Sequence, residues 1–82
     1  MELKSKIREY LLEKFFEEDN KDELQDSTPL ISGGILDSIS TMQVVDYLEK
    51  EFNVEFEPHE VDEEFLDTID LIVEIVESKL ND

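Results

Sequence analysis

The sequence contains no cysteine and only one histidine among its 82 residues. The protein therefore has no disulfide, no thiolate ligand for a metal and no nucleophilic thiol of its own. The histidine, His59, follows Pro58 in a polar stretch that offers no partner to orient it as a catalytic base. We therefore expect His59 to be a solvated surface residue, and we predict neither a catalytic residue, nor a metal site, nor enzymatic activity.

Basic residues are scarce: seven lysines and arginines face 24 aspartates and glutamates, which gives a net charge of −17. Such a charge repels phosphate backbones and anionic lipids, so we expect no nucleic-acid partner. No apolar run approaches the roughly 20 residues of a membrane span, and the opening MELKSKIREY lacks the apolar core of a signal peptide. The sequence predicts a soluble, cytoplasmic protein that does not insert into membranes.

The charge is unevenly distributed along the chain. Residues 1–21 hold six acids and five bases, net −1, whereas residues 22–82 hold 18 acids and two lysines, net −16. A long acidic segment is often disordered, but here apolar residues recur at helical spacing. A chain of this size buries one modest core at most, so we predict a single domain over residues 1–82.

Apolar residues repeat every three or four positions in three segments, which predicts amphipathic helices. A first helix is expected over residues 2–17. A second should begin at Asp37 or Ser38 and end near residues 51–53, with a buried stripe at Ile39, Met42, Val45, Leu48 and Phe52. After an extended connector, Pro58 can open a short third helix that carries Val61 and Phe65. Asp67 or Thr68 can cap a fourth, with its stripe at Ile69, Ile72, Ile75, Val76 and Leu80. The predicted fold class is all-α: a four-helix bundle with three long helices and one short helix.

A long first loop is predicted from Asp19 to Leu36, where the helical pattern fails and Gly33 and Gly34 favour a turn. Loops of about 18 residues are uncommon in compact domains and are often functional. Its apolar residues indicate that it is pinned onto the core; they are Leu24, Leu30, Ile31, Ile35 and Leu36.

The most informative segment is Gly33-Gly34-Ile35-Leu36-Asp37-Ser38-Ile39. Its glycines let the chain turn tightly and deliver Ser38 to the start of a helix, where its side chain should project into solvent. The unpaired N–H groups and partial positive charge of a helix N-terminus suit a phosphate ester on that serine. Taken alone, the segment is more typical of a plain Asp or Ser helix cap after a glycine-rich loop.

Its surroundings favour the functional interpretation, because the chain resembles the acyl carrier protein family over nearly its whole length. Residues 34–39 match Gly-x-x-Asp-Ser-[Leu/Ile], and STMQVVDYLEKEF, NVEFEP and DTIDLIVEIVESKL match the following helix, connector and last helix. The resemblance implies that a phosphopantetheinyl transferase attaches 4'-phosphopantetheine to Ser38, and that Asp37 helps to position magnesium during the transfer. The arm would supply the thiol that this cysteine-free chain lacks.

The resemblance also implies partners: the transferase, a cargo-loading ligase, and enzymes that process acyl or aminoacyl thioesters. The acids of the second helix that we expect to meet their basic docking patches are Asp46, Glu49 and Glu51. Ser40, Gln43 and Lys50 interrupt this face, which weakens the case for fatty-acid synthesis, and SGGILDSISTMQ and HEVDEEFLDTI look similar to D-alanyl and other aminoacyl carriers. The cargo stays open between acyl and aminoacyl groups, and we expect a monomer. The alternative is an acidic helical interaction adaptor without a prosthetic group.

Overall fold

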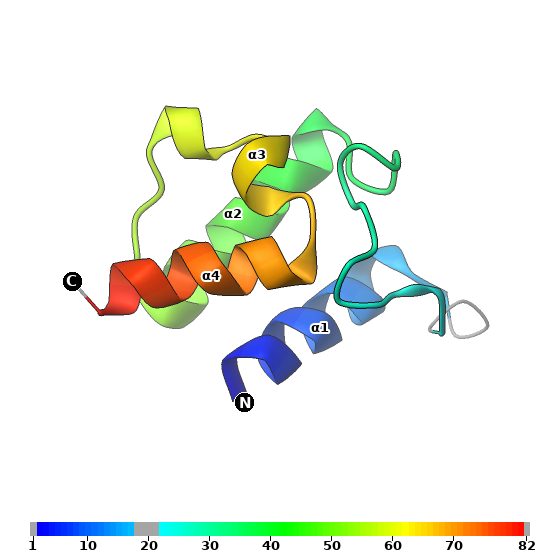
Figure 1. The fold of residues 1–82 in the computed structure, drawn as a ribbon, viewed down its shortest axis with the longest axis horizontal. Helices are drawn as coiled ribbons and strands as arrows, with labels where there is room; N and C mark the ends of the chain where they lie inside the picture. The colour runs from blue at the N-terminus through cyan, green and yellow to red at the C-terminus, as the bar shows by residue number, and fades with distance from the viewer. Residues whose placement is uncertain (1, 18–21, 82) are drawn as a thin grey trace.

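The computed structural model describes residues 2–17 and 22–81, and within this part the fold is all-helical, as predicted. The elements are α1 (Glu2–Phe15), α2 (Ser38–Phe52), the 3-10 helix η2 (Pro58–Glu60), α3 (Glu63–Leu66) and α4 (Ile69–Leu80). Helix α4 contacts α1, α2 and α3, and in Figure 1 it lies between α1 below it and α2 and α3 above it. None of the described helices is long and apolar enough to cross a membrane.

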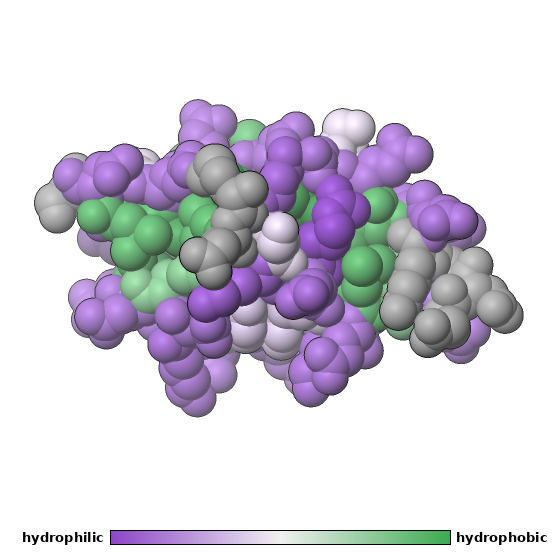
Figure 2. All heavy atoms as spheres, turned by 90° about the horizontal axis from the view of Figure 1, so that it is seen from below, coloured by the Kyte–Doolittle hydropathy of each residue, from purple (hydrophilic) through white to green (hydrophobic). Residues whose placement is uncertain are grey.

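One apolar core joins the helices to the segment that precedes α2. Helix α4 contributes three of the core's fully buried residues, Ile69, Ile72 and Val76, in agreement with the central position of that helix. The remaining core residues are Ile7, Leu11, Leu24, Leu30, Leu36, Val44, Val45, Leu48 and Leu66. Hydrophilic residues cover most of the face seen in Figure 2, and apolar residues show between them.

Basic residues of α1 bind the acidic segment that follows it. Lys4 pairs with Asp26 at 2.6 Å, and Arg8 pairs with the same carboxylate and donates to the backbone oxygen of Leu24 at 2.8 Å. These cations of α1 therefore neutralise part of the later acidity within the molecule.

The predicted burial of α2 is wrong at two positions. Ile39 is 72% exposed and Met42 is 56% exposed, whereas the buried face consists of Thr41, Val44, Val45 and Leu48. At about 100° per residue, Ile39 falls opposite this face and Met42 at its edge. The polar Thr41 takes the buried place because its Oγ1 donates to the carbonyl of Asp37 at 2.7 Å.

The remaining helices differ from the expectation in detail. The predicted third helix is two separate elements, η2 and α3, because Val61 leaves the helical conformation and Asp62 is extended. Thr68 caps α4 by accepting from the N–H of Leu71, but Leu80 at its far end is 50% exposed instead of buried. Helix α1 ends at Phe15, two residues earlier than predicted.

Of the long loop predicted from Asp19 to Leu36, residues 19–21 lie outside the described part, and the described residues 24–36 contain no helix or strand. Leu24, Leu30 and Leu36 are at most 3% exposed, and Ile31 and Ile35 pack against the same core. These five anchors hold the backbone that leads into α2.

Candidate functional site

Ser38 is the first residue of α2 and is exposed, as predicted. Asp37 before it is extended and caps the helix: the N–H of Ser40 donates to Asp37 Oδ1 at 2.7 Å. That hydrogen bond is the main reason that the pKa of Asp37 lies below its ordinary value. Together with the bonds from Thr41 to the Asp37 carbonyl, the cap fixes the direction in which α2 starts.

Both glycines before Ser38 are required by the backbone. A Cβ on Gly33 would lie 2.3 Å from the carbonyl oxygen of Pro29, which is closer than any real contact. Gly34 has φ +83°, a conformation that side chains disfavour. Two backbone hydrogen bonds close the turn. The N–H of Gly34 donates to the carbonyl of Ile31 at 3.1 Å, and the N–H of Leu36 donates to the carbonyl of Leu30 at 2.8 Å. A larger residue in place of either glycine would shift the backbone segment that leads to Ser38.

Asp67 fastens this turn to the junction between α3 and α4, a role that the sequence did not reveal. Its Oδ1 accepts from the N–H groups of Ile31 and Ser32, and its Oδ2 from the Ser32 hydroxyl, each at 2.8 Å. Its carbonyl accepts from the N–H of Leu30 at 2.6 Å. Burial raises the pKa of Asp67, but the bonds from Ser32 and Ile31 outweigh it, and the pKa is lowered. The carboxylate is therefore held in its charged form.

Two grooves open beside Ser38, and Ser38 and Met42 line both. The α1 groove is also lined by Tyr10, Lys14, Ile39, Gln43 and Asp46. The α3 groove is lined by the apolar Ile31, Leu36 and Val61, by Thr41 and by four acidic residues. These acidic residues are Asp37, Asp62, Glu63 and Glu64. A group attached to Ser38 can thus lie against the protein in either of two directions.

The three acids of α2 that we expect to meet partners have different surroundings. Asp46 is exposed and pairs with Lys50 at 3.1 Å, one turn along α2. Glu51 is exposed and pairs with Lys6 of α1 at 3.3 Å. Glu49 is half-buried, and its carboxylate accepts from the N–H of Phe56 at 2.8 Å, which holds the connector after α2. Of the three, Asp46 lines a groove together with Ser38.

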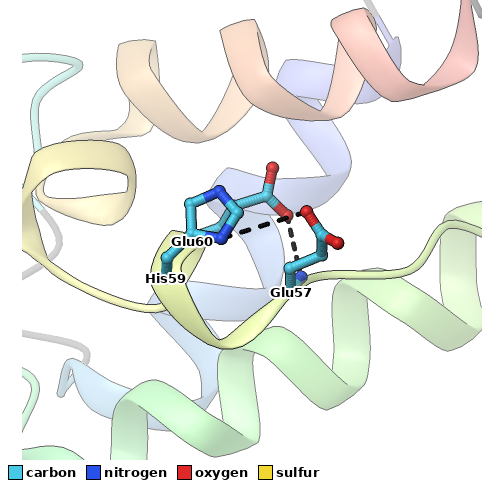
Figure 3. Close-up of side chains that lie close together, drawn as sticks. All are labelled: Glu57, His59 and Glu60. Atoms are coloured by element: carbon cyan, nitrogen blue, oxygen red, sulfur yellow. Dashed lines mark hydrogen bonds and ion pairs between the residues drawn. The ribbon is translucent and has the colours of Figure 1, made fainter.

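His59 is exposed, and one ligand atom each from Glu57, His59 and Glu60 lie within 4.8 Å of one another (Figure 3). Hydrogen bonds give the Glu60 side chain a structural role. Glu60 accepts from the N–H of Glu57 at 2.8 Å and from Lys79 at 2.7 Å, which completes the capping box of η2 and ties it to α4. These hydrogen bonds lower the pKa of Glu60, and the bond from the Glu57 backbone has the largest effect. A cation at this cluster would have to displace the ammonium group of Lys79.

A comparison with protein families decides the class of this chain. The family model described as "Phosphopantetheine attachment site" matches residues 5–76. The chain belongs to this phosphopantetheine-binding family. Its members carry 4'-phosphopantetheine covalently, and the general role of the domain is that of a carrier that meets a phosphopantetheinyl transferase and processing enzymes. A search of curated proteins found no match.

The residues at the start of α2 fit a covalently attached arm. The hydroxyl-bearing Ser38 is exposed on a helix end that the Asp37 cap and the glycine turn fix in place. The two grooves beside Ser38 provide room for an arm that extends from the serine along the protein surface. When bound, a phosphopantetheine arm supplies a terminal thiol, and the chain has none of its own.

Proposed function

We propose that this protein carries acyl or aminoacyl groups as thioesters on a 4'-phosphopantetheine arm attached to Ser38. The observation that supports Ser38 is its position: it is the exposed first residue of α2, directly after the capping Asp37, and it lines both grooves. Two other serines are near in the sequence. Ser32 is engaged by Asp67 through its hydroxyl, and Ser40 is only half-exposed on α2.

The residues around Ser38 then have supporting roles. Asp37 holds the start of α2 and, as the family resemblance implies, helps to position magnesium while the arm is transferred from coenzyme A. Asp46 is the acid of α2 best placed to meet a basic patch on the transferase or on a loading ligase, since it is exposed beside the serine. We assign Glu51 a smaller part in docking because it does not line a groove with Ser38, and Glu49 the smallest because its carboxylate holds the Phe56 N–H.

The protein catalyses nothing in this proposal: residues 1–82 form one cytoplasmic, monomeric carrier domain, and the enzymes it meets perform the chemistry. The scarcity of basic residues fits partners that dock through positive surfaces.

The proposal is tested by incubating the protein with coenzyme A, magnesium and a broad-specificity phosphopantetheinyl transferase and measuring the intact mass. The wild-type chain should gain the mass of one arm, and Ser38→Ala should gain none. Ser40→Ala is the matched control, since it removes a hydroxyl two residues away from the same helix end, and it should still be modified. A wild-type chain that gains no mass would contradict the proposal and favour the adaptor alternative.

A further inference from the structure

The two grooves beside Ser38 differ in charge. Four acidic residues line the α3 groove, and none of the residues that line it is basic. The carboxylates of two of them are fixed in place: Asp37 accepts from the N–H of Ser40, and Asp62 accepts from the N–H of Glu64 at 2.9 Å. A negatively charged group on Ser38 is therefore repelled from that side at neutral pH.

The α1 groove is close to neutral by comparison. Lys14 lines it together with one acid, Asp46, and the charge of that acid is shared with Lys50 at 3.1 Å. Stacking of the Tyr10 and Tyr47 rings, 3.9 Å apart at the centroids, holds α1 and α2 together at the groove. The hydroxyl of Tyr10 donates to the carbonyl of Gln43 at 3.3 Å, so the two walls are joined by a direct contact.

The walls of the α1 groove also match the chemistry of a phosphopantetheine arm. The ester that joins the arm to a serine is a phosphodiester with one negative charge, and the rest of the arm combines methyl groups with amide bonds. Lys14 offers an ammonium group, and the exposed side chain of Gln43 offers an amide donor and acceptor. Ile39 and Met42, which the fold leaves exposed, provide apolar surface.

We propose that the phosphodiester on Ser38 pairs with Lys14 and that the arm rests in the α1 groove, along Met42 and Gln43, instead of in the α3 groove. This inference rests on the attachment to Ser38 proposed above. It gives the exposed Ile39 and Met42 a function within the protein, and it leaves the acidic α3 groove free of the arm in the resting state.

The test compares amide chemical shifts of the ¹⁵N-labelled protein before and after arm attachment, with the mass spectrum confirming the modification. Residues 10–14 report on the α1 groove and residues 61–64 on the α3 groove, and both segments are remote in sequence from Ser38. We expect larger attachment-induced shifts at residues 10–14. Lys14→Met, compared before and after attachment in the same way, should lose most of them, and raised salt should weaken them in the wild type because it screens the ion pair.

Lys6→Met is the matched control, since it makes the same change on the same helix at a lysine that pairs with Glu51 and does not line the α1 groove. It should leave the shifts at residues 10–14 in place. The inference is overturned if the larger shifts occur at residues 61–64, if neither segment shifts, or if Lys14→Met and Lys6→Met behave alike. A chain that gains no arm mass overturns the attachment to Ser38 as well, so the two failures are distinguishable.

Discussion

Removal of the Asp67 carboxylate should clearly destabilise the protein, although Asp67 lies far in sequence from the loop that it holds. The carboxylate accepts three hydrogen bonds, from the N–H groups of Ile31 and Ser32 and from the Ser32 hydroxyl. A net contribution of about 0.5–1.5 kcal/mol for each bond, reduced because Ser32 is exposed, gives about 2 kcal/mol for Asp67→Ala. Asp67→Asn keeps one acceptor oxygen and loses the charge, so it should cost about half as much.

The measurement is urea unfolding followed by circular dichroism. With a urea dependence of about 1 kcal/mol per molar for so small a protein, Asp67→Ala should lower the midpoint by about 2 M. Asp46→Ala is the matched control: its carboxylate is exposed and, among the described residues, pairs with Lys50 one turn away, and it should cost about 0.5 kcal/mol or less. If Asp67→Ala shifts the midpoint no further than Asp46→Ala, the fastening of the loop by Asp67 is refuted.

Three further predictions concern charge. The melting temperature should rise from low to moderate salt, because a net charge of −17 opposes compaction. Millimolar magnesium should raise the melting temperature more than its ionic strength predicts. Melting temperatures that stay flat or fall as salt is added would contradict this. The pKa values of Asp26, Asp37 and Asp67 are lowered in the folded state. The stability that these carboxylates contribute is therefore present above their unfolded pKa of about 3.9 and should be lost as the pH falls below it. Urea midpoints measured from pH 5 to pH 2.5 would show this loss. Asp46→Lys should slow arm attachment at low salt by about 1 kcal/mol in the barrier, and Glu55→Lys, beyond the far end of α2, should slow it much less; equal slowing would mean that only total charge matters.

The starts of α2 and α4 were predictable from local chemistry to within one residue. Asp37 and Thr68 cap these helices through their own side chains, and each was one of two neighbouring candidates in the sequence. The glycines before α2 likewise indicated that this segment is not helical. Its isolated leucines and isoleucines indicated that it packs against the core.

The orientation of α2 was not predictable from the same pattern. Ile39, Met42 and Val45 form one apolar row, and Val44, Val45 and Leu48 form another that overlaps it. Apolar spacing alone does not choose between two overlapping rows, and the polar Thr41 concealed the true one. Thr41 is tolerated in the core because its hydroxyl is bonded within the helix.

Asp67 was missed as a site residue for a different reason. It lies 35 residues from Ser32, and the contact between them forms only when the α3–α4 junction packs against the turn. In the sequence Asp67 is a second candidate for a helix cap beside Thr68. Its hydrogen bonds to a distant loop leave no local signal.

The central claim, that Ser38 carries the arm, is tested most directly by locating the modification in the wild-type protein. The modified protein would be digested, and the peptide that contains residues 32–43 would be fragmented in a mass spectrometer. We predict that the arm, or the phosphate that remains after its loss, is found on Ser38. Its presence on Ser32 or Ser40, or an unmodified peptide from a protein exposed to coenzyme A, magnesium and the transferase, would contradict the account.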